Sequence, residues 1–315
     1  MREFHVPVLQ AQAVAYAVPE PGERVCVDCT LGAGGHAEAL LRAMGPAGRL
    51  LGIDRDPEAL RLAGERLAEF GDRVRLVHGN FEDLGELVAQ NGWGRTDAVV
   101  YDFGVSSMHL DRPERGFSYQ HDAPLDMRMD TTQQVSARSI VNEYSEREIS
   151  RIIWTYGEDR WAARIAKFIV AARQRAPLET TDQLVEAILA AIPQAARRGG
   201  PHPARRTFQA LRIAVNRELE AIETSLPQAV DVLAPGGRLV ALSYHSLEDR
   251  IVKRALRAEA GAESPRLRIL TKKPVRPEDE EVARNPRASA GRLRAAERLA
   301  ARPESTGPFG GGSAA

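Results

Sequence analysis

The sequence predicts an α/β protein, with a doubly wound parallel sheet interrupted by an inserted helical domain. Four short apolar runs alternate with amphipathic stretches over the first 110 residues, as expected of a parallel sheet covered by helices. The sequence pattern is polar and loop-like from about 111 to 135 and nearly all helical from about 136 to 225. An apolar strand pattern then resumes, so the helical stretch interrupts the sheet instead of following it.

The strands expected in the first part are 24–30, 49–54, 73–79 and 97–104. A helix should begin at Pro57, because proline is well tolerated at a first helical position. Within the helical stretch, Ser145 and Glu148 have the spacing of a capping box, and Thr181 with Asp182 should open another helix. A helix is also expected from about residue 204.

Beyond the helical stretch, residues 230–245 should form a helix end, a Pro-Gly-Gly turn and a strand, followed by a helix at 248–260 and a strand at 267–274. These patterns predict one domain made of 1–110 and 226–300 and an inserted helical domain at 111–225. Residues 301–315, rich in Gly, Ser and Pro, should be a disordered tail.

The composition is that of an ordinary globular protein, with 43% hydrophobic and 27% charged residues among 315. No apolar stretch is long enough for a membrane helix, and the first residues do not resemble a signal peptide. We therefore expect a cytoplasmic protein. Cys26 and Cys29 form a lone C-x-x-C, which is half of a structural zinc site. Two buried strand residues are the preferred interpretation.

A charge gradient lies beneath the zero net charge. Residues 1–110 carry a net −6 and residues 251–315 a net +6, and 39 of the 43 basic residues are arginine. An arginine-rich genome would place such residues on any surface, whereas phosphate binding would need them on one face. The sequence leaves both explanations open.

The glycine-rich segment at 28–36 is the strongest candidate for a cofactor site. Gly32, Gly34 and Ala37 satisfy the dinucleotide fingerprint, so a nicotinamide or flavin enzyme is one alternative. Asp28, four residues before the first glycine, and Asp54, at the end of the second strand, favour S-adenosylmethionine instead, although Asp54 by itself fits both cofactors. Asp54 is placed to accept hydrogen bonds from ribose hydroxyls.

The ends of the third and fourth strands carry further candidates. Asn80 or Phe81 could flank an adenine, and Asp102 leads into a Gly-Val-Ser-Ser turn. In doubly wound folds the carboxyl ends of the strands line the ligand crevice. Four such ends with glycines, acids or aromatics together favour a binding site over simple turn formation.

Two more clusters lie in the second half of the chain. The segment at 243–250 places Tyr244 and His245 at a strand end, where His245 is either a general base or a packed, hydrogen-bonded residue. A Ser-His-Asp triad lacks the G-x-S-x-G turn it would need. On the predicted helix from about 204, Arg205, Arg212 and Phe208 could meet phosphates and a base, or could form a solvated face.

Eight segments together resemble the bacterial small-subunit ribosomal RNA methyltransferase H family, from His5 to about Arg298. They include DCTLGAGGH at 28–36, IDRDP at 53–57, PLDMRMD at 124–130, ARRTFQALRIAVN at 204–216 and SYHSLEDRIVK at 243–253. The resemblance implies a class I methyltransferase sheet, S-adenosylmethionine as methyl donor, and methylation of the exocyclic N4 of a cytidine in the decoding centre of 16S ribosomal RNA.

Carried over residue by residue, the family's cofactor contacts fall on Gly34, Gly35, His36, Asp54, Phe81, Asp102 and His109. Position 109 departs from the family, which usually has glutamine there. The expected partner is 16S ribosomal RNA or the small ribosomal subunit, with a homodimer left open and neither a membrane nor a metal involved. The alternatives are an NAD-dependent oxidoreductase and a non-catalytic RNA-binding protein.

The chemistry narrows the roles of individual residues. Methyl transfer from a sulfonium is a direct displacement, so positioning of the amine is the main task. Asp102 is the candidate catalytic residue, because its carboxylate could accept hydrogen bonds from the amine. Methylation at C5 would need a cysteine nucleophile in a substrate loop, which the chain lacks. Arg205, Arg206, Tyr244 and His245 are the substrate-binding candidates, with Tyr244 as a stacking surface for the base.

Overall fold

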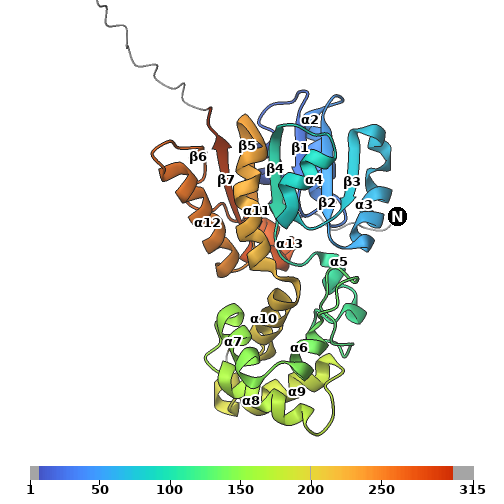
Figure 1. The fold of residues 1–315 in the computed structure, drawn as a ribbon, viewed down its shortest axis with the longest axis vertical. Coiled ribbons are helices and arrows are strands. Elements are labelled where there is room, and N and C mark those ends of the chain that lie inside the picture. Colours follow the sequence, from blue (N-terminus) through green and yellow to red (C-terminus); the bar gives the residue numbers. More distant parts are fainter. Residues whose placement is uncertain (1–6, 199, 301–315) are drawn as a thin grey trace, which may run out of the picture.

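The computed structural model describes residues 7–198 and 200–300, which form a sheet covered by helices on both faces and a group of helices beyond the carboxyl ends of its central strands (Figure 1). The strands are β1 (Val25–Asp28), β2 (Arg49–Asp54), β3 (Val74–His78), β4 (Thr96–Asp102), β5 (Leu233–Ser243), β6 (Leu267–Ile269) and β7 (Arg292–Arg298). Their order in the sheet is β3-β2-β1-β4-β5-β7-β6.

The first five strands are parallel, and β7 runs antiparallel to both of its neighbours. The strand order reverses between β1 and β4, which is where doubly wound sheets open a crevice for a ligand. The expected α/β class with a doubly wound sheet is therefore confirmed.

Thirteen α-helices and five short 3-10 helices connect or cover the strands in the described part of the chain. The α-helices are α1 (Gln10–Ala17), α2 (Gly35–Met44), α3 (Pro57–Leu67), α4 (Leu84–Gln90), α5 (Ser107–Leu110), α6 (Ala137–Glu143), α7 (Glu146–Gly157), α8 (Ala162–Arg173), α9 (Thr181–Ala191), α10 (Ala204–Asn216), α11 (Glu218–Val232), α12 (Ser246–Gly261) and α13 (Asp279–Arg284). The 3-10 helices are η1 (Ala68–Arg73), η2 (Phe81–Asp83), η3 (Pro113–Arg115), η4 (Gln194–Arg197) and η5 (Pro286–Ala290).

Two hydrophobic cores hold the helices against the sheet. Helices α1, α2 and α3 pack on one face through residues such as Leu40 and Leu67, and α4, α11 and α12 pack on the other through residues such as Ile222 and Val252. Alternate residues of each central strand therefore enter opposite cores, and the strands are buried on both faces.

Helices α6 to α10 surround a third core of their own. This core takes in buried residues from Phe117 to Val215, whereas α11 returns to the sheet. The turn between α10 and α11 is made at Arg217, which has a φ of 48°. The division into domains remains a proposal, and the packing favours a boundary near Asn216 over the one expected at residue 225.

Local predictions agree with the structure where they rested on specific capping or helix-starting residues. The capping box of Ser145 and Glu148 is present, and α10 begins at Ala204. The cap of α9 is Thr180, one residue before the expected start. The strand expected at 267–274 is only three residues long, and neither α1 nor β7 was anticipated from the apolar pattern.

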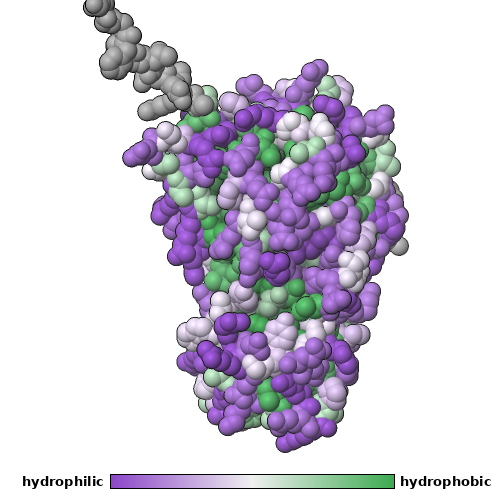
Figure 2. Space-filling model, in the orientation of Figure 1, coloured by the Kyte–Doolittle hydropathy of each residue, from purple (hydrophilic) through white to green (hydrophobic). Residues whose placement is uncertain are grey.

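The face seen in Figure 2 is covered mainly by hydrophilic residues. Among residues 7–198 and 200–300, no helix combines the length and apolarity needed to cross a membrane. Cys26 and Cys29 are both buried and unpaired at β1, as expected of strand residues. The tail predicted at 301–315 lies outside the described residues.

Candidate active site

A cavity of about 1140 Å³ lies where the carboxyl ends of β1, β2, β4 and β5 meet the helical insertion. It brings together most of the residues that the sequence singled out. Lining it are Gly35, His36, Asp54, Phe81, Asp102, His109, Arg205, Tyr244 and His245. Asp28, Gly34, Ala37, Asn80 and Arg206 were also singled out but do not line it, and the Arg206 guanidinium instead donates to the Glu158 carbonyl at 2.8 Å.

The glycine-rich turn leads from β1 into α2 with little room for side chains. Gly34 caps α2 with a φ of 79°, a conformation that L-residues with a Cβ rarely adopt. A Cβ on Gly35 would lie 2.4 Å from Cγ of Pro7. Glycine is therefore needed at 34 for the left-handed turn and at 35 because Pro7 lies too close for a Cβ.

Asp54 closes this turn from the end of β2. Its Oδ2 accepts a hydrogen bond from the Gly32 N–H at 2.7 Å, and its Oδ1 accepts one from the Asp56 N–H at 2.9 Å. Burial raises the pKa of Asp54, although these two N–H groups oppose the shift. Each oxygen keeps one lone pair directed elsewhere, so the carboxylate can still accept hydrogen bonds from a diol.

Both ring nitrogens of His109 make hydrogen bonds within the protein, which the sequence did not predict. Its Nδ1 accepts from the Ser106 N–H at 3.3 Å, so Nε2 carries the proton and donates it to Oδ2 of Asp56 at 2.8 Å. Arg115 also donates to that oxygen, at 2.9 Å. Burial alone would raise the pKa of Asp56, but His109 and Arg115 lower it to about 2. His109 thus borders the cavity with both ring nitrogens already engaged within the protein, and its contact with the cofactor stays a prediction.

Phe81 provides an apolar surface at the end of β3. Its ring lies edge-on to Tyr101 at 5.7 Å, and the Arg55 guanidinium lies 5.5 Å from its centroid. The neighbouring Asn80 is occupied elsewhere, because its side-chain oxygen accepts from the Glu82 N–H and from Arg55. Of the two residues considered for an adenine, only Phe81 reaches the cavity.

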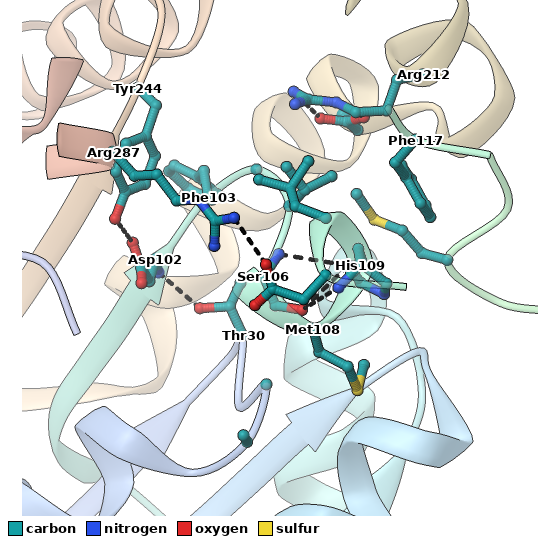
Figure 3. A pocket seen from close by; sticks show the side chains of 18 of the residues that line it. Thr30, Asp102, Phe103, Ser106, Met108, His109, Phe117, Arg212, Tyr244 and Arg287 are labelled. Atoms are coloured by element: carbon teal, nitrogen blue, oxygen red, sulfur yellow. Dashed lines mark hydrogen bonds and ion pairs between the residues drawn. The ribbon is translucent and has the colours of Figure 1, made fainter. Parts of the chain in front are cut away.

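Asp102 is held from two sides. The Tyr244 hydroxyl donates to its Oδ1 at 2.6 Å, and Nε2 of His36 lies 3.4 Å from its Oδ2. Figure 3 shows Tyr244 pointing at Asp102, with Arg212 and Phe117 across the cavity. Tyr244 was expected to offer its ring to a base. That stays a prediction, while the hydroxyl fixes a carboxylate, which adds a positioning role.

Buried charge continues behind Asp102. Burial raises the pKa of Asp28 to about 6, and its Oδ2 has no hydrogen-bond partner among the described residues. Burial would lower the pKa of His36, but the carboxylates of Asp102 and Asp28 raise it. Neither ring nitrogen of His36 makes a well-aligned hydrogen bond within the described chain. Polar atoms left in this way are what a polar ligand would satisfy.

His245 is the N-cap of α12, not a free base in the cavity. Its ring accepts from the Glu248 N–H, and its Nε2 lies 3.0 Å from Oε1 of Glu248. Arg212 was one candidate for meeting phosphate, but its Nε and Nη2 donate to the two carboxylate oxygens of Glu218 at 2.9 Å, so Glu218 already balances its charge. Phe208 is 97% buried in the insertion core, with only its edge at the cavity.

Glu248 is the residue that sequence reasoning missed. It is fully buried, lines the cavity, and keeps a carboxylate because His245 and Arg212 lower its pKa against the effect of burial. The signal was its place three residues after His245, the spacing of a capping box. Glu218, His245 and Glu248 form a group whose ligand atoms lie within 4.8 Å of one another. Since Arg212 already neutralises Glu218, we interpret the group as a balanced charge cluster.

These residues fit S-adenosylmethionine. Asp54 suits a ribose diol, Phe81 suits the face of an adenine, and the carboxylate of Asp102 suits a positively charged group. The cavity also exceeds the roughly 300–1,000 Å³ of a site for one small ligand. Its sheet side can hold the cofactor while its insertion side remains for a second molecule.

The chain is similar to proteins with a known activity over nearly its whole length. The model of the MraW methylase family matches residues 2–299. A protein of Symbiobacterium thermophilum named ribosomal RNA small subunit methyltransferase H is 52% identical, covering 96% of this chain and 98% of its own. Proteins of the same name from Heliobacterium modesticaldum and Geobacter sulfurreducens are 51% and 52% identical, each covering 94% of this chain and 98% and 99% of their own.

Proposed function

The chain belongs to the MraW methylase family and is an S-adenosylmethionine-dependent methyltransferase, and we propose that it methylates the exocyclic N4 of a cytidine in 16S ribosomal RNA, at the decoding centre. The relatives' shared name supports the RNA, and the resemblance described above supports the base and atom. The nicotinamide alternative has no support from the relatives.

One observation carries the proposal. Asp102 lies in the same cavity as the glycine turn and Asp54 on one side and Arg205 on the other. A methyl donor and a polyanionic acceptor can therefore reach one carboxylate at the same time. The arrangement also favours an enzyme over a non-catalytic RNA-binding protein, because RNA binding alone does not require a half-buried carboxylate whose orientation Tyr244 fixes beside the glycine turn.

S-adenosylmethionine, when bound, supplies a methyl group on a positively charged sulfur. The glycine turn and Asp54 would orient it, and Phe81 would cover one face of its adenine. Asp102 would face its positive charge. The buried environment strengthens each of these interactions, since they act where little water competes.

Asp102 would also position the acceptor. The lone pair of a cytosine amine is delocalised into the ring, so a carboxylate that accepts hydrogen bonds from the amine makes the nitrogen a better nucleophile and aligns it. The Tyr244 hydroxyl fixes the orientation of that carboxylate at 2.6 Å. The proton released after transfer can pass to water, so a separate general base is not required, and His245 is already paired with Glu248.

The test is to map the methyl group by mass spectrometry on small-subunit RNA from cells with and without this protein. We expect one cytidine to lose one methyl group from N4 in cells that lack it. Purified enzyme with labelled methyl donor should restore the mark on those subunits or on their naked RNA, which also decides between the two substrates. A lost mark on another base, or no lost mark, would refute the proposed reaction.

Two further expectations accompany the proposal. A protein that acts on ribosomal RNA in a bacterium works in the cytoplasm, in keeping with the composition. The homodimer left open by the sequence stays a prediction, which sedimentation of the purified protein would check.

A further inference from the structure

Tyr119 is an aromatic residue that the proposed reaction does not use. It follows η3 in the polar loop and borders the cavity from the insertion side. Its ring stacks on that of His202 with centroids 4.8 Å apart and planes 8° apart. Phe208 meets it edge-on at 5.7 Å. Two neighbours thus hold the ring, while it presents surface to the cavity.

The support under this ring is itself fixed. Nδ1 of the exposed His202 accepts a hydrogen bond from the Ala204 N–H at 3.2 Å, at the start of α10. Phe208 is anchored in the core of the insertion. A rigid, half-buried aromatic ring loses little conformational freedom when a ligand stacks on it, which favours binding.

Two polar groups on this side of the cavity can accept or donate further hydrogen bonds. Its hydroxyl makes no hydrogen bond within residues 7–198 and 200–300, and the exposed guanidinium of Arg205, which lines the same cavity, has no carboxylate partner there. Arg206, the next residue, is already bonded to Glu158. An aromatic ring next to an unpaired arginine is suited to a nucleobase with its phosphate.

Tyr119 and Asp102 belong to different walls of the cavity. Asp102 ends a strand of the sheet, whereas Tyr119 packs against the insertion core. We propose that Tyr119, backed by His202 and Phe208, is a stacking site for a second nucleobase of the RNA, one that flanks the methylated cytidine, with Arg205 on the adjoining phosphate. The inference rests on the proposed function, since it assumes an RNA substrate.

The experiment compares two single-stranded probes of the same length and charge, within the roughly 4–16 nucleotides that one such site covers. One is an oligouridine, and the other is the same backbone without bases. Neither contains cytosine, so preference for the first reports stacking outside the target position. Affinities are measured by fluorescence anisotropy with the full-length wild type and with Tyr119→Leu, Tyr119→Trp and Tyr144→Leu.

The wild type should bind the oligouridine more tightly than the abasic probe. Tyr119→Leu should weaken oligouridine binding by roughly 5- to 150-fold, the range for losing one stacked base, and leave the abasic probe unaffected. Tyr119→Trp should retain the preference, because indole also stacks. The control Tyr144→Leu removes a tyrosine of the same insertion core that does not line the cavity, and should keep the preference.

An equal affinity of the wild type for both probes would overturn the proposal, as would an unchanged preference in Tyr119→Leu. Binding of S-adenosylhomocysteine to each variant shows that the sheet side is intact. Methyl transfer to small ribosomal subunits separates the two hypotheses. If the wild type methylates RNA while Tyr119→Leu binds oligouridine normally, only the stacking site is wrong. If the wild type transfers no methyl group to RNA, the proposed function itself fails.

Discussion

The two walls of the cavity differ in how far their polar groups are already satisfied. On the sheet wall, formed by Asp54, Phe81 and Asp102, both carboxylates hold hydrogen bonds of 2.6 to 2.9 Å from the protein. On the insertion wall, formed by Tyr119, Arg205 and Phe208, the hydroxyl and the guanidinium have no such partner in the described chain. The sheet wall is prepared in advance for a small ligand, whereas the insertion wall depends on groups that the RNA brings.

The largest effect should come from breaking the support of the sheet wall at Asp56. Asp56→Asn would leave the buried His109 and Arg115 facing a neutral amide. We expect the free energy of unfolding to fall by about 3–5 kcal/mol, the cost of removing one partner of a buried ion pair. Chemical denaturation checks this. Glu58→Gln is the control, since its pairs with Arg61 and Arg112 are largely exposed and should matter by under about 1 kcal/mol.

The same residue predicts a pH dependence. The folded-state pKa of Asp56 is about 2, below its ordinary value of 3.8. A lowered pKa gives stability that is present above the unfolded pKa and is lost as the pH falls from about 5 towards 2. The contribution of about 2–3 kcal/mol should be missing from the pH profile of Asp56→Asn. Parallel profiles for the two proteins would contradict the assignment.

Asp102→Ala tests whether the sheet wall serves chemistry or only binding. We expect turnover to drop by roughly 100-fold or more, as when a preorganised polar group is removed. Affinity for S-adenosylhomocysteine is measured in parallel, and a defect confined to that affinity would make Asp102 a binding residue. Asp97→Ala, at the opposite end of β4 where the carboxylate accepts from the Val25 N–H, should retain turnover.

Tyr244→Phe removes one hydroxyl and should have a smaller effect. Without the hydrogen bond, Asp102 loses its fixed orientation, and we expect kcat to fall about 10-fold, or ~1.4 kcal/mol, with little change in KM. Tyr101→Phe provides the control. Its hydroxyl hydrogen-bonds to Ser225 inside the core that α4, α11 and α12 form with the sheet, and Tyr101 does not border the cavity. This variant should therefore alter stability and not kcat. Equal kcat in both variants would remove Tyr244 from the positioning of Asp102.

The smallest expected effect separates two adjacent arginines on the insertion wall. Arg205→Ala should lower the slope of log affinity for single-stranded RNA against log salt by about 0.7, the value for one phosphate contact. Arg206→Ala should change it less, because that guanidinium is bonded to Glu158 outside the cavity. The sequence predicted phosphate contacts at both positions. Equal changes in slope would show that the unpaired guanidinium gives Arg205 no advantage.

Strand ends were predictable because apolar runs and glycine turns have local causes. Asp54 and Asp102 end buried strands, and parallel topology alone brings them to one edge. Strand β7 was not predictable in this way, since Arg292, Arg294 and Arg298 interrupt its apolar pattern. Arg294 is buried only because Asp249 of α12 pairs with it at 2.7 Å, and no local pattern reports such a partner.

The roles of single side chains in the site were predicted less well for the same reason. Tyr244 and Asp102 are 142 residues apart in the chain, and nothing in either segment indicates that the hydroxyl meets the carboxylate. The pairing of Arg212 with Glu218 depends on the left-handed turn at Arg217, a conformation that sequence patterns do not predict for arginine. Motif spacing predicted which residues line the cavity. Tertiary contacts decide which of their polar groups remain available to a ligand.

The position of β7 in the sheet has a consequence for the order in which the chain can fold. This strand lies between β5 and β6, yet it follows both of them in the sequence. During synthesis the first five strands can pair as they emerge, whereas β6 has no neighbour until residues 292–298 arrive. The parallel part of the sheet can therefore assemble ahead of this edge. Ribosome-bound nascent chains that stop before Arg292 should leave β6 open to proteolysis.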